Sequence, residues 1–308
     1  MKKNKIIIAL CTNKRPVLLK NAITSLSKIN IPEGFNVEFI LIDNDRSQSG
    51  LEPFNELSCI LPFGSQYYLE NEIGITFARN RALIEANNKN ADYLAFFDDD
   101  AVVEPNWLQQ LTHYTSDNHK IITTGPQLSI FESGCPEWAK EIIYFNPKRY
   151  LSGTRLRWAA TNNILIPMDI YRKYGIEFDN SLRYSGGSDQ CFCMEAKQLG
   201  YEIIWVDDAI VKENVPLSRT NREWVIKRSF RYGSTGFFMH RKEKGLLYAF
   251  IASLFKSFYY AIYGVVKLIC SKPNNNLAKL EGVCLLARSL GWVSGIFNKK
   301  HNEYAARK

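Results

Sequence analysis

Three consecutive carboxylates, Asp98, Asp99 and Asp100, are the feature of this sequence best suited to chemistry. They follow the apolar segment 93–97, a pattern typical of a buried strand that ends at a polar site. Adjacent carboxylates repel one another, so a fold keeps them together where water, a cation or a basic ligand offsets the repulsion. In an extended segment Asp98 and Asp100 point to the same side, and with a diphosphate they can hold Mg²⁺ or Mn²⁺. The alternative is a solvated acidic turn before a helix that Pro105 opens.

A second candidate carboxylate is Asp189, which follows Gly186, Gly187 and Ser188. We expect a helix over 190–199 to begin directly after it. Glycines at such a position let the backbone approach a ligand, and the helix dipole stabilises the carboxylate. An ordinary Asp N-cap would give the same pattern.

Strands that end at these polar residues are predicted by short apolar runs, and the spacing of apolar residues between them predicts helices. The expected strands are 5–10, 37–42, 66–70, 93–97, 121–124, 161–166 and 201–206, and the expected helices are 16–29, 75–87, 105–114, 169–174 and 190–199; segment 131–153 reads as loops. Alternating strands and helices form a doubly wound, mostly parallel α/β sheet, in which the residues after each strand meet at one edge. The glycine motifs of dinucleotide oxidoreductases and P-loop NTPases are missing from this sequence, which argues against both classes.

Charge is distributed unevenly along the 308 residues. From residue 212 onward there are 18 Lys+Arg and 5 Asp+Glu, a net charge of +13, which leaves −5 for residues 1–211 of a chain with net charge +8. This asymmetry indicates a cation-dependent acidic body and a basic C-terminal region that meets an anionic surface. The apolar run 6–10 is too short for a signal peptide, so we expect the protein to be cytoplasmic.

The basic region begins with a helix that Asn221 is expected to cap. Trp224, Arg228 and Arg231 then share one helix face, and Arg219 precedes them. Arginine clusters bind phosphates bidentately, so these three arginines are candidates for a donor diphosphate or an acceptor phosphate. The alternatives are a solvated basic face and a nucleic-acid site, and we expect no nucleic acid because the acidic body would repel a polyanion.

A mostly apolar stretch over 246–270 contains Lys256 and Lys267, which fall on one line of a helix. A helix with a narrow polar stripe and basic flanks suits the plane of an anionic membrane surface. A single span ranks second, because a lysine near its centre costs roughly 3 kcal/mol. A buried hairpin with the later apolar segment 283–297 is the remaining alternative.

Together these motifs resemble family 2 glycosyltransferases of the GT-A fold, from Ile6 to about Val215. The resemblance rests on five pieces in order: Cys11-Thr12-Asn13-Lys14-Arg15, Ile42-Asp43-Asn44, Gly74 with Ala78-Arg79-Asn80, Phe97-Asp98-Asp99-Asp100, and Gly186-Gly187-Ser188-Asp189. It implies a Rossmann-like GT-A catalytic domain over 1–215, with a nucleotide-sugar-binding half (1–125) and an acceptor-binding half (126–215). Residues 216–308 would form a basic, helical, membrane-associated region.

The resemblance also implies roles for individual residues in an inverting transfer from a nucleotide sugar, with a UDP-sugar favoured. The donor would be bound by Thr12, Asp43, Arg79, Asp98 and Asp99; Asp100 would bind the metal, and Asp189 would be the general base. This assignment agrees with the chemistry, because an attacking hydroxyl needs a carboxylate to take its proton and a departing diphosphate needs its charge neutralised.

Two positions depart from the family pattern. Ser188 stands where many relatives have a Glu before the base. Glu213 stands near the position where many relatives have a metal-binding His, and it is a competent oxygen ligand. Glu213 is equally well explained as a surface charge paired with Lys212.

The predicted function is therefore transfer of a sugar to a hydroxyl of a lipid-linked or cell-surface glycan, at the cytosolic face of a membrane. Two other functions would use the same sheet. One is a nucleotidyltransferase, although residues 11–16 contain no glycine for the basic loop it would need. The other is a non-catalytic partner that binds a sugar nucleotide or glycan.

Overall fold

The computed structural model describes residues 3–115, 120–184, 186–272 and 274–297. Its chain divides into two compact units. The first contains Met1–Leu128, Lys148–Arg183 and Ser188–Asn214; the second contains Ser129–Pro147, Tyr184–Gly187 and Val215–Lys308.

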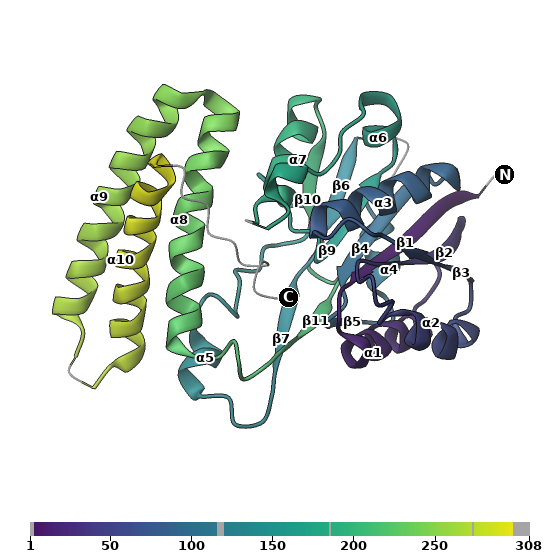
Figure 1. The fold of residues 1–308 in the computed structure, drawn as a ribbon, viewed down its shortest axis with the longest axis horizontal. Helices are drawn as coiled ribbons and strands as arrows, with labels where there is room; N and C mark the ends of the chain where they lie inside the picture. The colour runs from purple at the N-terminus through teal and green to yellow at the C-terminus, as the bar shows by residue number, and fades with distance from the viewer. Residues whose placement is uncertain (1–2, 116–119, 185, 273, 298–308) are drawn as a thin grey trace. The chain divides into compact units, whose positions relative to one another are not determined.

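An eight-stranded mixed sheet is the framework of the first unit (Figure 1). Its order is β3-β2-β1-β4-β9-β6-β10-β8, with β1 Asn4–Thr12, β2 Phe35–Asp43, β3 Gly64–Leu69, β4 Tyr93–Asp98, β6 Ile121–Thr124, β8 Arg155–Leu156, β9 Asn163–Pro167 and β10 Glu202–Trp205. Strands β1 to β4 are mutually parallel, as are β6 and β10, whereas β9 runs antiparallel to both β4 and β6. The predicted α/β fold with a mostly parallel sheet is confirmed.

Helices pack on both faces of this sheet (Figure 1). One face contacts α1 Pro16–Leu26, α2 Leu51–Leu57 and α4 Trp107–Thr112; the other contacts α3 Ile75–Asn88, α6 Asp169–Tyr174 and α7 Ser188–Gln198. Short 3₁₀ turns lie at Ser58–Ile60 and Asn180–Leu182. The two-sided packing explains why the central strands read as continuous apolar runs.

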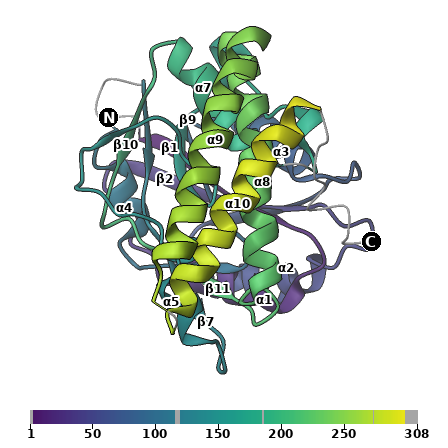
Figure 2. The same cartoon turned by 90° about the vertical axis from the view of Figure 1, so that its left-hand side faces the viewer.

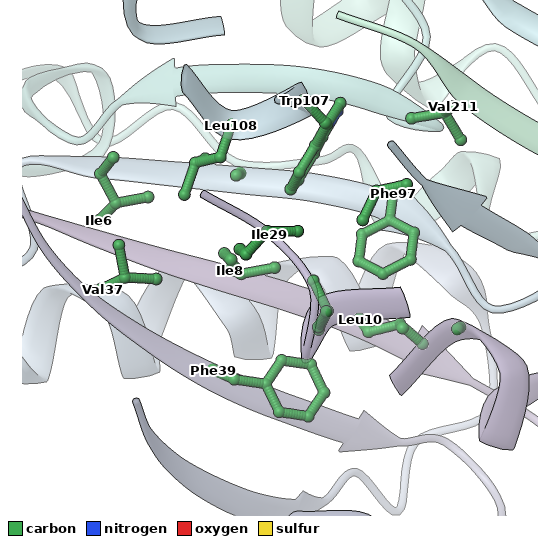
Figure 3. Close-up of a cluster of buried hydrophobic side chains, with 14 of the residues drawn as sticks. Ile6, Ile8, Leu10, Ile29, Val37, Phe39, Phe97, Trp107, Leu108 and Val211 are labelled. Atoms are coloured by element: carbon green, nitrogen blue, oxygen red, sulfur yellow. The ribbon is translucent and has the colours of Figure 1, made fainter. Parts of the chain in front are cut away.

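Strand β1 shows how the sequence supplies both cores. Successive side chains of a strand point to opposite faces. Ile6, Ile8 and Leu10 therefore join one buried cluster, with Phe39 and Trp107 among its other members (Figure 3), while Ile7 and Ala9 belong to the cluster on the other face.

A second, three-stranded sheet has the order β5-β11-β7. Its strands are β5 Ala101–Val103, β7 Gln127–Phe131 and β11 Val211–Val215. In the pairing of β5 with β11, Glu213 lies opposite Ala101. This sheet was not predicted from the sequence, and it brings residue 213 beside the end of the three-carboxylate motif.

The second unit contains α5 Glu137–Glu141 and three long helices, α8 Arg222–Lys244, α9 Leu246–Cys270 and α10 Asn276–Ile296, which lie side by side (Figures 1 and 2). The predicted N-cap is confirmed, because the Asn221 side chain accepts a hydrogen bond from Trp224 N. Glycines set the closeness of α8 and α10: a Cβ on Gly233 would clash with the carbonyl oxygen of Arg288, and one on Gly291 with that of Phe230. The two backbones are therefore in direct contact.

The small and polar residues of α9 form a stripe that packs against α8 and α10. Ala249, Ser253 and Gly264 are buried, Lys256 lies over the Trp292 ring and Lys267 pairs with Glu281. Its large apolar side chains are exposed, among them Phe255, Phe258 and Ile269 at 68–77%. Helix α9 is long and apolar enough to cross a membrane, judged by length and composition alone. The stripe seen in the sequence therefore packs against a neighbouring helix, and the apolar face is left open.

Other local differences are small. Helix α4 begins at Trp107 rather than Pro105, since Trp107 N bonds to Glu104 O in a turn that first encloses the proline. Helix α2 was not predicted, and α5 lies in a segment that we expected to form loops.

Candidate active site

The three-carboxylate motif lies at the end of β4, between β1 and β9. Asp98 is the last residue of the strand and pairs in register with Cys11 of β1. Asp99 and Asp100 follow in a turn and are each only 5% exposed. Asp99 and Asp100 at the predicted strand end are therefore buried, which argues against the alternative of a solvated acidic turn.

Arg15 and Thr12, from the end of β1 and the turn after it, contact this motif. Thr12 Oγ1 donates to Asp99 at 2.8 Å. Arg15 Nη1 donates to Asp99 at 2.7 Å and to Asp100 at 2.9 Å. A guanidinium bridging two buried carboxylates supplies part of the positive charge that the motif requires. Arg15 was not among the predicted site residues, although its position directly after a strand and the acidic motif were both visible in the sequence.

Asp98 faces a different set of charges. Burial, followed by the neighbouring Asp100 carboxylate, raises the pKa of Asp98 to about 7, while the Arg79 guanidinium lowers it and Asp99 and Glu213 add to the rise. Glu213 lies close enough to act on Asp98 because β11 pairs with β5 and because Asn214 N donates to Asp100 O at 2.8 Å. A site that repels its own ionised carboxylates favours an added cation.

The residues present fit Mg²⁺ or Mn²⁺ as a cofactor. Among the residues that the structure describes, no three His, Cys, Asp or Glu side chains gather closely enough to hold a metal ion unaided. Hard divalent ions commonly take one or two carboxylates and complete their shell with water and substrate phosphates. Asp100 and Asp98 supply such oxygens, and Glu213 adds negative charge beside them.

Asp189 lies in the first turn of α7, and Arg79 of α3 holds it in place. Arg79 Nη1 donates to Asp189 Oδ1 at 2.6 Å and to Ser188 Oγ at 3.2 Å. Thr161 N donates to the second carboxylate oxygen of Asp189 at 3.3 Å. The backbone before Asp189 turns through Gly186 and Gly187, whose φ angles of 75° and 91° favour glycine.

Arg79 connects the two acidic groups. It pairs with Asp189, and its charge also acts on Asp98. The guanidinium lies over the Phe178 ring at 5.6 Å, and the residue is only 9% exposed. The structure therefore brings Asp189 and the three-carboxylate motif to one region of the first unit, although about ninety positions separate them in the sequence.

Asp43 is placed at the same strand edge, opposite Thr12 in register. Its carboxylate is fully buried and accepts from Gly50 N at 2.7 Å, Tyr67 OH at 3.0 Å and Asp45 N at 3.1 Å. Burial raises the pKa of Asp43, and the hydrogen bonds from these three donors oppose that rise. In this conformation Asp43 orders the loop between β2 and α2.

Two asparagines that were not predicted also support the site. The Asn44 side chain donates to Glu70 O and Glu72 O and accepts from Gly74 N, which fixes the turn before the helix that carries Arg79. Asn163 of β9 pairs in register with Phe97 of β4 and is completely buried. Asn44 belongs to one of the five motif pieces, but its bonding partners were not predictable, because they are backbone groups of distant segments. Asn163 had no sequence signal, because its partners also come from distant segments.

The remaining predicted residues, Arg219, Arg228 and Arg231, belong to the second unit. Arg219 lies in the turn before α8, whereas Arg228 and Arg231 lie on that helix. Arg231 is buried, at 8% exposure.

Comparisons with known proteins agree with this fold and site. The model of Glycosyl transferase family 2 matches residues 6–175. The succinoglycan biosynthesis protein ExoM of Rhizobium meliloti (strain 1021) is 30% identical over 307 residues, which cover 98% of this chain and 96% of ExoM.

Two solved structures have the same fold. The mannosyltransferase PcManGT from Pyrobaculum calidifontis, solved with GDP-Man and Mn²⁺, has a TM-score of 0.58 at 14% identity and covers 96% of this chain and 88% of its own. S. aureus TarS 1–349 in complex with UDP has a TM-score of 0.53 at 14% identity, with 96% and 92% covered.

The sheet is GT-A-like, and the family model together with the ExoM match defines the class as a glycosyltransferase. More specifically, the chain belongs to glycosyl transferase family 2, since the family model spans more than half of it and the ExoM match spans nearly all of it. Family membership argues against the nucleotidyltransferase alternative, and it makes an enzyme the better interpretation than a non-catalytic partner.

Proposed function

We propose that this glycosyltransferase moves a sugar from a nucleoside diphosphate sugar to a hydroxyl of a lipid-linked glycan, with inversion at C1. The observation that carries the proposal is the shared position of Arg79, which pairs with Asp189 and lies in the field of Asp98. This shared position supports a candidate base close to a candidate diphosphate site, which a single displacement requires.

In the proposed reaction Asp189 accepts the proton of the acceptor hydroxyl while that oxygen forms its bond to C1 of the sugar. The bond between C1 and the diphosphate oxygen breaks, and its electron pair leaves with the nucleoside diphosphate. One base on the face opposite the leaving group gives inversion. Arg79 orients the Asp189 carboxylate for this step, because its hydrogen bond fixes one oxygen and leaves lone pairs on the other.

On the donor side, Asp100 and Asp98 would hold Mg²⁺ or Mn²⁺, with Glu213 as a further acidic neighbour. When bound, such an ion neutralises charge that develops on the departing diphosphate. Thr12 and Asp99 are fixed to each other by a hydrogen bond and would border the nucleoside, with Asp43 behind them. Arg15 is positioned to exchange its carboxylate partners for phosphate oxygens.

Known relatives support the donor and acceptor classes. TarS has been solved with UDP and PcManGT with GDP-Man and Mn²⁺, and we propose a UDP-sugar as the first donor to test. ExoM is named for succinoglycan biosynthesis, which favours assembly of a polysaccharide. The exposed apolar face of α9, with basic residues at both of its ends, supports attachment to the cytosolic surface of an anionic membrane rather than a single span.

The test is a screen of nucleotide sugars with the purified protein, with and without Mn²⁺, in which release of nucleoside diphosphate is measured. Asp189→Asn should reduce turnover by at least about 100-fold and leave donor affinity within about twofold, because the base acts on the acceptor. Asp208→Asn, at an exposed turn in the same unit, is the matched control and should retain activity. Full turnover by Asp189→Asn would refute the assignment of the base.

A further inference from the structure

Three arginine side chains of the second unit surround one tyrosine ring. The guanidinium carbons of Arg228, Arg231 and Arg288 lie 5.5, 5.7 and 5.7 Å from the ring centroid of Tyr232. We call Arg228, Arg231 and Arg288 the arginine cluster. Helix α8 supplies the first two and α10 the third, so the cluster exists only when these helices pack together.

Aromatic side chains hold the cluster in a fixed arrangement. Arg228 lies 5.0 Å from the Trp224 ring and donates from Nε to Tyr232 OH at 3.0 Å. Arg288 lies 4.8 Å from the Tyr260 ring of α9. Cation–π contacts of this kind orient a guanidinium through its face, and its edge can donate hydrogen bonds at the same time.

The helix backbones beneath the cluster also have little freedom. The carbonyl oxygen of Arg288 occupies the space where Gly233 would carry a Cβ, so α8 and α10 touch at the base of the cluster. Arg231 Nη1 lies 3.5 Å from the position of a Cβ on Gly186, so the backbone at Gly186 passes beside this guanidinium. The three charges are therefore preorganised by the fold.

Arg288 has unmet hydrogen-bonding capacity within the cluster. Arg288 Nε is buried and has no hydrogen-bond partner among the residues that the structure describes. A buried donor without a partner costs free energy. A phosphate oxygen corrects this deficit, because the guanidinium fork matches phosphate in geometry and phosphate carries the opposite charge.

We propose that the arginine cluster binds the diphosphate of a lipid-linked acceptor, an inference that rests on the proposed function and adds Arg288 to the residues considered above. A donor diphosphate has the carboxylates of the first unit and their cation, whereas this cluster is built from cationic and aromatic groups. Tyr260 connects the cluster to α9, whose exposed apolar face, including Phe255 and Phe258, is suited to a lipid chain. One unit thus presents groups for both parts of such an acceptor.

The test is isothermal titration calorimetry of the full chain with three probes: farnesyl diphosphate in detergent, inorganic pyrophosphate, and UDP with Mn²⁺. Arg288→Gln and Arg231→Gln should each weaken farnesyl diphosphate and pyrophosphate binding by about tenfold or more, the effect of losing a charge-assisted hydrogen bond. UDP affinity should stay within twofold. Lys227→Gln, an exposed residue of α8 paired with Glu223, removes the same charge outside the cluster and should change none of the three.

Several results would overturn the inference: an equal loss for Lys227→Gln, unchanged farnesyl diphosphate binding in Arg288→Gln, or a parallel loss of UDP affinity, which would assign the cluster to the donor. Binding of pyrophosphate without farnesyl diphosphate would exclude the lipid acceptor. Thermal melts monitored by circular dichroism verify folding, and Arg228→Gln replaces any variant that fails to fold. Because no turnover is needed, a protein that binds farnesyl diphosphate through the cluster but transfers no sugar would refute the proposed function alone.

Discussion

Asn163 gives the sharpest prediction about what holds the active site together. Its buried side chain accepts from Trp107 Nε1 at 2.8 Å and donates to Ala209 O at 2.7 Å and Pro126 O at 3.0 Å. These bonds fasten β9 to the segments that lead into β7 and β11. Since β11 carries Glu213 to the carboxylate motif, Asn163 supports the site without belonging to it.

Replacement by leucine preserves the size of the side chain and removes all three bonds. Each buried group left without a partner costs about 1–3 kcal/mol, and relaxation of the loops recovers part of that. We therefore expect Asn163→Leu to lower the free energy of unfolding by about 3–5 kcal/mol. For a domain of this size, such a loss corresponds to a fall in melting temperature of roughly 10 °C.

Urea denaturation followed by tryptophan fluorescence measures this change. Asn162→Leu is the matched control, since the half-buried Asn162 side chain bonds, among the residues that the structure describes, only to the Gln127 side chain, and it should cost less than about 1 kcal/mol. A double-mutant cycle with Trp107→Phe should show a coupling of about 1–2 kcal/mol, because that substitution removes the donor which Asn163→Leu leaves unpaired. A loss below 1 kcal/mol for Asn163→Leu, or no coupling, would refute the reasoning.

Three further perturbations have definite expected outcomes. Asp98→Asn removes one of several crowded carboxylates, so it should raise the melting temperature of the metal-free protein, reduce the stabilisation by Mn²⁺ and abolish transfer. Partial burial acts to raise the pKa of Glu38, but hydrogen bonds from Lys5 and Lys89 outweigh it and hold that pKa below its usual value. This stabilisation is present above about pH 4.3 and is lost as the pH falls, so the cost of Glu38→Gln, about 0.5–1 kcal/mol at pH 7 in urea titrations, should shrink as the pH falls below that value. Phe255→Glu with Phe258→Glu should abolish flotation with vesicles containing anionic lipid while leaving the circular dichroism melt unchanged, whereas retained flotation would exclude α9 as the contact surface.

The sequence was informative where structure depends on local pattern. The sequences of β1, β2 and β4 are apolar because helices cover both faces of the sheet. These segments could therefore be recognised as strands without knowing which strands they pair with. Polar residues after parallel strands meet at one edge, which predicted the proximity of Thr12, Asp43 and the carboxylate motif.

The sequence was less informative where structure depends on pairing between distant segments. Strand β11 reads Val-Lys-Glu-Asn-Val, which has no clear strand pattern, and it forms because β5 offers an edge. The polar stripe on α9 could be recognised in the sequence, but a narrow polar stripe can face either water or a neighbouring helix. The contact of Lys256 with the Trp292 ring of α10 shows that this stripe faces a helix, and the sequence of α9 alone could not predict that contact.

The same distinction explains why the carboxylates were found and Arg15 was not. Three adjacent acidic residues repel one another, and this repulsion can be recognised in one short segment of sequence. The positive charges that offset it come from separate elements: Arg15 after β1 acts on Asp99 and Asp100, and Arg79 on α3 acts on Asp98 and Asp189. A basic residue acquires such a role from the strand order, because β1 lies directly beside β4. Charges that a fold must balance are therefore better guides to a site than the groups that balance them.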